Sequence, residues 1–177
     1  ASHELEMYDD ELGCEAVEAF GGVATLAEDQ SRECATIAQA LDKLETITES
    51  VLAQGKFPLI LGGEHSITAG SIRPFAKRYD DLVILHFDAH GDLYDSLGGN
   101  RHSHASPFAR IMEEGLAQAL TQVGIRTLND HQQTQVSKFG VKVIDMRNWS
   151  PDIDLNLSGP VYLSFDMDVL DPAFAPG

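Results

Sequence analysis

Three short motifs in this sequence each group side chains that can bind a metal ion. Each follows an apolar run, and they read Gly63-Glu64-His65-Ser66, Asp88-Ala89-His90-Gly91-Asp92 and Asp166-Met167-Asp168. Alternate residues of an extended segment point the same way, so the carboxylates and imidazoles of one motif can face a common side. Brought together, such groups would repel one another without a cation. Oxygen ligands with imidazole suit manganese better than a thiolate-type zinc site, and we therefore predict a site for two divalent cations.

The elements that must position these motifs are short apolar strands that alternate with helices. We expect strands at residues 57–61, 82–87, 119–125, 141–146 and 161–165, and helices at residues 31–54, 66–77, 104–114 and 130–139. Ser31 and Gly55 are start and stop signals for the first helix, and Pro74 should distort the second. Unbroken apolar strands separated by helices are typical of a parallel sheet covered on both faces. The predicted fold is α/β, with three α/β/α layers around a mainly parallel sheet.

The expected strands also predict where the three motifs meet. In open parallel sheets, ligands bind beyond the carboxyl ends of the strands. The strands at 57–61, 82–87 and 161–165 lead directly into the three motifs. A single Asp-x-Asp at a strand end is more often a turn or a helix cap than a pair of ligands. Three motifs that each end an apolar strand favour a metal site at one rim of the sheet.

Composition narrows the classes of partner and location. The chain has 177 residues, enough for one domain with a core, and a formal net charge of −16. That charge argues against nucleic acid and anionic membranes as partners and could favour a cationic substrate, although solubility or a saline habitat is the simpler explanation. No apolar run approaches the roughly 20 residues that span a bilayer, and no signal peptide opens the chain. We therefore expect a cytoplasmic protein.

The remaining cysteines and histidines receive structural interpretations. Cys14 and Cys34 lack metal-type spacing and are expected to be reduced structural thiols. His86 lies inside an apolar strand, which predicts a packed and hydrogen-bonded core residue. His3 and His131 are expected to be solvated.

The three motifs resemble those of the ureohydrolase family, which comprises arginases, agmatinases and their relatives. The family's strings run close to Gly-Gly-Asp-His-Ser, Asp-Ala-His-x-Asp and Ser-Phe-Asp-x-Asp-x-x-Asp-Pro, and this sequence matches them at residues 62–66, 88–92 and 164–172. Residues 100–108 and 122–126 also resemble family segments, so the similarity spans about residues 57–177. Glu64 stands where many members carry aspartate, a change that preserves the charge.

The resemblance implies a catalytic centre with two Mn²⁺ ions in each subunit. One ion would be held by His65, Asp88, Asp92 and Asp166, and the other by Asp88, His90, Asp166 and Asp168. Water activated between the cations would attack the guanidinium carbon of the substrate, and Asp92 would orient that water and take its proton. His104 would pass a proton to the departing amine. Asn100 and His102, in the same loop, are further candidates for contact with the substrate.

The implied reaction is hydrolysis of a small cationic guanidino compound to urea and an amine. Agmatine, which would give putrescine, is the first choice because it needs fewer anchors than arginine. The alternative is the arginase reaction, from L-arginine to ornithine and urea. A two-metal phosphoesterase would want a Gly-Asn-His-Asp/Glu string, which Gly99-Asn100-Arg101-His102 does not match. A fragment that binds metal without catalysis is the last alternative.

Against the family pattern, residues 1–177 are expected to form one arginase-like ureohydrolase domain that is incomplete at both ends. The expected missing parts are the first strand and the C-terminal part, which carries a glutamate that grips the guanidinium. We therefore expect this chain alone to be weakly active or inactive and the full-length enzyme to be competent. Family members commonly assemble as trimers or hexamers, so a homo-oligomer is expected for the full-length protein.

Overall fold

The computed structural model describes residues 8–19, 21–26 and 34–175, in a chain that divides into two compact units, residues 1–32 and 33–177. In the first unit, β1 (Tyr8–Asp9) and β2 (Cys14–Glu15) form an antiparallel pair, and α1 (Ala16–Ala19) follows. Cys14 and Cys34 are both free thiols, as expected. His3 and the helix start signal at Ser31 lie outside the described residues.

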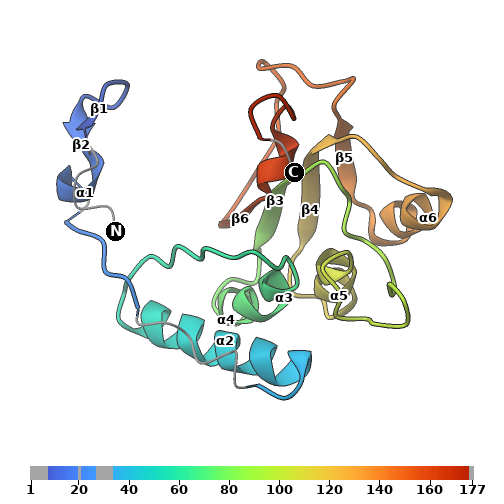
Figure 1. Cartoon of the computed structure of the whole chain (residues 1–177), viewed down its shortest axis with the longest axis horizontal. Coiled ribbons are helices and arrows are strands. Elements are labelled where there is room, and N and C mark those ends of the chain that lie inside the picture. The colour runs from blue at the N-terminus through green and yellow to red at the C-terminus, as the bar shows by residue number, and fades with distance from the viewer. Residues whose placement is uncertain (1–7, 20, 27–33, 176–177) are drawn as a thin grey trace. The chain divides into compact units, whose positions relative to one another are not determined.

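Four parallel strands form the sheet of the second unit, in the order β5–β4–β3–β6 (Figure 1). They are β3 (Val83–Phe87), β4 (Ala119–Ile125), β5 (Lys142–Asp145) and β6 (Val161–Phe165). β3 has a neighbour on each side, and its first four residues are buried. The predicted α/β fold with a parallel sheet is therefore confirmed.

The helices of the second unit lie close to the predicted ranges, and capping residues and prolines explain several of their boundaries. They are α2 (Ile37–Ala53), α3 (Ile67–Ser71), α4 (Arg73–Ala76), α5 (Pro107–Glu113) and α6 (Asp130–Phe139). α2 begins later than expected because the Thr36 side chain caps it by accepting from the Gln39 N–H at 3.2 Å. The helix expected at 66–77 is two helices, and Pro74 lies in the first turn of α4, where a missing N–H is tolerated. No helix in the described part of the chain is both long and apolar enough to cross a membrane.

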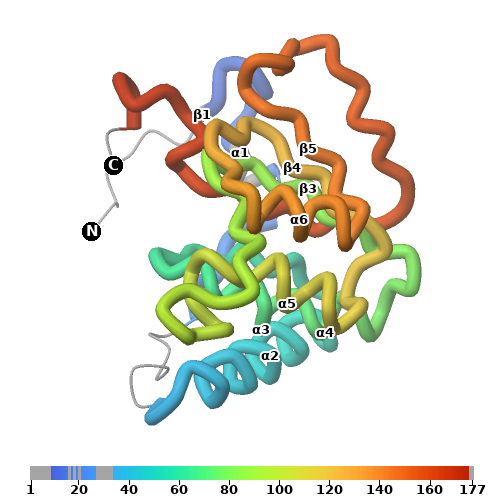
Figure 2. Tube along the Cα trace, turned by 90° about the vertical axis from the view of Figure 1, so that its right-hand side faces the viewer, coloured from blue at the N-terminus to red at the C-terminus, as the bar shows by residue number. Residues whose placement is uncertain are grey.

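The two faces of the sheet are covered differently (Figures 1 and 2). One face buries Ile84 and Leu120 against helical residues that include Leu41 of α2 and Phe108 of α5. The other face holds a smaller buried cluster of strand residues, namely Leu85, Val123 and Ile144. Partly buried residues of the extended segment that precedes β6 pack against this cluster, namely Ile153, Leu155 and Leu157. In the described residues, helices thus cover one face and an extended segment covers part of the other.

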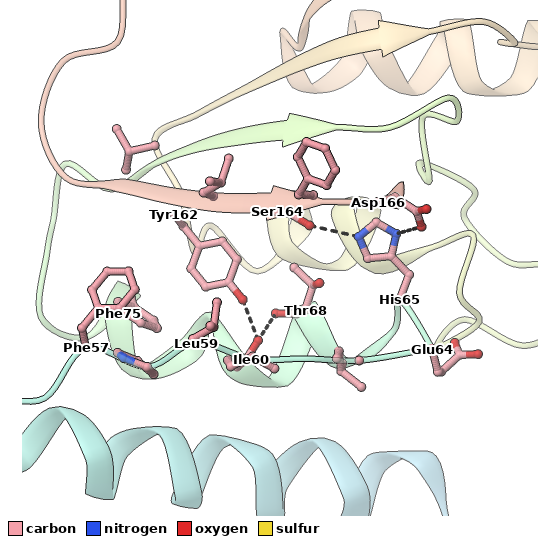
Figure 3. A pocket seen from close by; sticks show the side chains of 18 residues that line it. Phe57, Leu59, Ile60, Glu64, His65, Thr68, Phe75, Tyr162, Ser164 and Asp166 are labelled. Carbon is pink, nitrogen blue, oxygen red and sulfur yellow. Dashed lines mark hydrogen bonds and ion pairs between the residues drawn. The ribbon is translucent and has the colours of Figure 1, made fainter. Parts of the chain in front are cut away.

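Residues 57–61 do not form the predicted strand. They lie across a cavity of about 270 Å³ from β6, and Phe57, Leu59 and Leu61 are 91%, 74% and 87% exposed (Figure 3). Among the described residues β6 pairs only with β3, so one edge of β6 is open and the apolar segment has no strand beside it. A strand needs a neighbour for its backbone hydrogen bonds, and the apolar pattern alone does not supply one.

Candidate metal centre

The ends of β3 and β6 place two candidate ligands next to each other. Phe87, the last residue of β3, is in register with Phe165, the last residue of β6. The Asp166 N–H donates to the Phe87 carbonyl at 2.8 Å, so Asp88 and Asp166 leave the sheet together at its carboxyl rim. The Asp88 side chain is only 1% exposed, whereas that of Asp166 is 37% exposed. Asp88 is therefore the buried member of this pair.

His65 brings the first motif to the same place (Figure 3). Its Nδ1 atom lies 2.9 Å from Asp92 Oδ2, 3.4 Å from Asp88 Oδ2 and 3.6 Å from Asp166 Oδ2. Its Nε2 atom is 3.0 Å from the Ser164 hydroxyl, which holds the ring with Nδ1 toward the carboxylates. Nδ1 is buried, and its contacts are these close approaches to carboxylate oxygens.

His90 and Asp168 form a second group around Asp88. His90 Nδ1 lies 2.9 Å from Asp168 Oδ2 and 3.5 Å from Asp88 Oδ1. The other oxygen of Asp168 accepts from the Ala89 N–H at 3.0 Å. Asp88 therefore faces His65 with one carboxylate oxygen and His90 with the other. A carboxylate in this position can be shared by two cations.

The six ligand candidates lie in an electrostatic setting that favours cations. Burial alone lowers the pKa of His65, but the carboxylates of Asp92, Asp88 and Asp166 outweigh it, and the pKa is raised above its usual value. Burial is also the main cause that raises the pKa of Asp88 to about 7. A buried, unpartnered imidazole nitrogen among carboxylate oxygens fits a divalent cation, and the oxygen and nitrogen donors match the preference of Mn²⁺.

Local backbone geometry holds the ends of the ligand motifs. Asp92 has a φ of 47°, in the left-handed region that a non-glycine residue adopts only when its surroundings impose it. Asp168 lies in the short 3₁₀ helix η2 (Met167–Val169), and the Arg126 guanidinium donates to the carbonyls of Asp168 and Val169. The Arg126 contacts hold the backbone from which the Asp168 carboxylate projects.

His86 is a buried core residue, as the sequence predicts, with both ring nitrogens engaged. It is fully buried, and its ring centroid lies 4.0 Å from that of Phe108. Nε2 is 2.8 Å from Asp88 Oδ2, and Nδ1 is 3.0 Å from Gln122 Nε2. Burial, with His65 adding to it, lowers the pKa of His86 to about 3, so the ring is neutral. Because both nitrogens have partners, His86 is not a metal-ligand candidate, although it lies within reach of His65 and Asp88.

The three loop candidates remain apart from the ligand cluster. His104 and Asn100 are exposed and His102 is partly buried, and within the described residues none of them forms a hydrogen bond or ion pair with a ligand candidate. The loop nevertheless returns toward the cluster, because the Tyr94 N–H donates to the Ala105 carbonyl at 2.9 Å. This hydrogen bond holds Ala105, and with it the neighbouring His104, beside the chain segment that follows Asp92. His131, predicted to be solvated, is exposed.

Sequence reasoning missed two residues that support the cluster. Ser164 contacts His65 and Gln122 contacts His86. Both are polar residues inside apolar strands, and this feature of the sequence could have identified them as functional candidates. Their partners became evident only from the strand register, which places Gln122 and Ser164 on either side of His86.

Known proteins resemble this chain in both sequence and structure. The model of the arginase family matches residues 4–177. Arginase 1, mitochondrial, from Arabidopsis thaliana is 49% identical over 128 residues, which cover 68% of this chain and 37% of that protein. Guanidino acid hydrolase, mitochondrial, from Homo sapiens is 35% identical over 148 residues, covering 76% of this chain and 42% of that protein.

Two solved structures extend the comparison to the fold. The arginase from Medicago truncatula has a TM-score of 0.74 and 42% identity, and the match covers 82% of this chain and 49% of that one. The agmatine ureohydrolase of Thermoplasma volcanium has a TM-score of 0.79 and 31% identity, covering 98% and 59%. The chain therefore spans between 37% and 59% of the length of these relatives.

Proposed function

Because the chain belongs to the arginase family, we propose that it binds two Mn²⁺ ions and hydrolyses a guanidino compound to urea and an amine. The observation that carries this proposal is the position of Asp88, which faces His65 with one oxygen and His90 with the other. His65, Asp88, Asp92 and Asp166 would hold one ion, and Asp88, His90, Asp166 and Asp168 the other. The bound cations would lower the pKa of a water molecule and stabilise developing negative charge.

The protein's own side chains supply the proton transfers in this proposal. Asp92 lies at the cluster with its side chain 11% exposed, and it would orient the attacking water and accept its proton. His104 would donate a proton to the leaving nitrogen, from a loop that the Tyr94–Ala105 hydrogen bond holds beside the Asp92 segment. Asn100 and His102, in the same loop, would contact the substrate.

Two substrates fit the proposal, and different observations favour each. The sequence favours agmatine because it needs fewer anchors, and the match to the agmatine ureohydrolase of Thermoplasma volcanium covers 98% of this chain. L-Arginine is favoured by the 42% identity to the Medicago truncatula arginase structure, against 31% to that ureohydrolase structure. We place arginine first on that difference. Cytoplasmic location and assembly as trimers or hexamers stay predictions.

A urea assay tests the proposal. The purified chain, freed of metal and then loaded with MnCl₂, is incubated separately with L-arginine, agmatine and guanidinobutyrate. We expect metal-dependent urea release, weaker than that of a full-length relative, and greatest with L-arginine. Binding of Mn²⁺ with no urea from any of the three would favour a metal-binding protein without catalysis. Phosphate release from a phosphoester in place of urea would identify a phosphoesterase and overturn the proposal.

A further inference from the structure

One level of the sheet is entirely polar, whereas the residues around it on the same strands are mainly apolar. Parallel register places Gln122 of β4, His86 of β3 and Ser164 of β6 side by side. All three are buried. Two residues earlier along each strand, the same register brings together Leu120, Ile84 and Tyr162. A buried polar row needs internal hydrogen-bond partners, so its contacts are informative.

The direction of the hydrogen bonds in this row is determined by a main-chain atom. Gln122 Nε2 lies 2.6 Å from the Gly91 carbonyl oxygen, and a carbonyl oxygen only accepts. Exchanging the amide nitrogen and oxygen of Gln122 would bring two acceptors together at that distance, so the nitrogen must face Gly91. Gln122 Oε1, on the other side of the amide, is buried without a partner.

The same amide nitrogen determines the tautomer of His86. It donates one hydrogen to Gly91 and the other to His86 Nδ1, 3.0 Å away. Nδ1 therefore carries no proton, and the single ring proton lies on Nε2. Nε2 is 2.8 Å from Asp88 Oδ2 and donates to it. The second oxygen of Asp88 accepts from the His90 N–H at 2.6 Å.

We propose that Gln122 and His86 are positioning residues for metal binding, which hold the Asp88 carboxylate through a hydrogen-bond relay anchored at the Gly91 carbonyl. Each Asp88 oxygen then has one hydrogen bond and a lone pair left for a cation. The relay also joins both parts of the ligand motif, because Gly91 lies between His90 and Asp92. The space around residue 91 is full: a Cβ there would lie 2.6 Å from Gln132 Oε1 and 2.7 Å from Leu128 Cδ2. The inference rests on the proposed function, since it takes Asp88 as a metal ligand.

The first experiment measures the tautomer of His86 in the metal-free chain. In the metal-free chain labelled with ¹⁵N-histidine, NMR should show His86 as a neutral ring protonated on Nε2, its signals identified by their loss in His86→Phe. A proton on Nδ1, or a charged ring at neutral pH, would overturn the relay. This result does not depend on whether the protein is an enzyme.

The second experiment measures Mn²⁺ binding to the whole chain by EPR. Gln122→Glu is nearly isosteric, but its carboxylate cannot donate to Gly91 or His86. We expect its Mn²⁺ affinity to fall by about 10-fold, the lower end of the range found when a direct partner of a metal ligand is removed, because Gln122 acts on Asp88 through His86. Gln135→Glu is the matched control, because Gln135 is also buried yet lies outside the relay, and its affinity should equal that of the wild type.

Two further measurements distinguish a variant that does not fold from one that overturns the positioning role. Circular dichroism and urea unfolding establish that the variants are folded, and Gln122→Met replaces Gln122→Glu if the latter does not fold. Unchanged Mn²⁺ affinity in a folded Gln122 variant would overturn the positioning role. Failure of the wild-type chain to bind Mn²⁺ would instead overturn the proposed function, while leaving the NMR result on the tautomer to stand on its own.

Discussion

At the scale of single residues, the candidate centre depends most on Asp88, whose carboxylate makes several contacts at once. The carboxylate is almost completely buried, accepts one hydrogen bond on each oxygen, and faces a different histidine with each. Burial disfavours its charged form, which is why its pKa rises to about 7. A cation close to both oxygens would reverse that effect, so metal binding and ionisation of Asp88 support each other.

Replacing the shared carboxylate should therefore affect both ions. Asp88→Asn keeps the shape of the side chain and removes its charge, and we expect Mn²⁺ affinity to fall by more than about 100-fold, beyond the range for partners outside the ligand set. Isothermal titration with MnCl₂ measures the affinity and the number of ions bound. Asp80→Asn, at an exposed position outside the cluster, is the control and should bind as the wild type does. Retention of two tight sites in Asp88→Asn would contradict a shared ligand.

The sequence predicts the six ligand candidates because each motif ends an apolar run, and residue spacing alone indicates which side chains share a side. It does not predict that Ser164 holds His65 or that Gln122 holds His86. Those contacts depend on the register between strands that are far apart in the chain, which no local pattern reveals. The tautomer of His86 is even less accessible, because it is determined by a main-chain carbonyl.

At the scale of elements, the helices α2 and α3 approach each other closely at one glycine. A Cβ on Gly70 would lie 2.6 Å from the Leu41 carbonyl oxygen, and backbone atoms cannot move aside as a side chain can. We expect Gly70→Ala to lower the free energy of unfolding by about 1–3 kcal/mol, the usual range for overpacking. Urea unfolding measures the loss. Gly63→Ala is the control, because a Cβ at Gly63 would meet nothing within 4 Å. Equal stability of the two variants would show that α2 and α3 can separate without loss.

The α2–α4 contact also carries an ion-pair network whose contribution depends on pH. The Lys77 ammonium, 2.9 Å from Glu45, and the Arg73 guanidinium, 3.3 Å away, outweigh partial burial and lower the pKa of Glu45 below 4.5. A lowered pKa stabilises the folded state above the unfolded pKa, and this contribution disappears as the pH falls through the folded value. Glu45→Gln should lose about 0.5–1 kcal/mol at pH 7 and progressively less below pH 4.5. Urea unfolding at pH 7 and below pH 4.5 measures the loss of stability at each pH. A loss of stability that does not depend on pH would contradict the prediction. Glu49→Gln, whose side chain is 58% exposed, is the control and should lose less.

Elements were predictable where local signals decide them. The expected boundaries of β4, β6 and α6 agree with the structure, because apolar runs and capping residues lie within the element or directly beside it. α5 begins at Pro107, later than expected, because proline favours the first turn of a helix. The strand expected at residues 57–61 is wrong for a different reason, since a strand exists only with a partner and β6 lies across a cavity from this segment.

At the scale of the whole molecule, all six ligand candidates belong to the second of the two compact units. A chain that begins at Cys34 should therefore bind Mn²⁺ with the affinity of the full chain. Parallel EPR titrations of the two proteins test this, with circular dichroism to confirm that the shorter chain is folded. A weaker affinity in a folded chain from residue 34 would mean that the first unit takes part in the centre.

The open edge of β6 has a thermodynamic consequence. Phe57, Leu59 and Leu61, with Leu163 and Phe165 of β6, already expose half or more of their surface in the folded state. Their surface therefore gains less hydration on unfolding than buried side chains do, and the heat-capacity change of unfolding arises from newly hydrated apolar surface. At typical values per residue, 177 residues predict roughly 2.1–2.7 kcal mol⁻¹ K⁻¹. Calorimetry should give a smaller value, and with it a stability curve that is flatter in temperature than the chain length suggests.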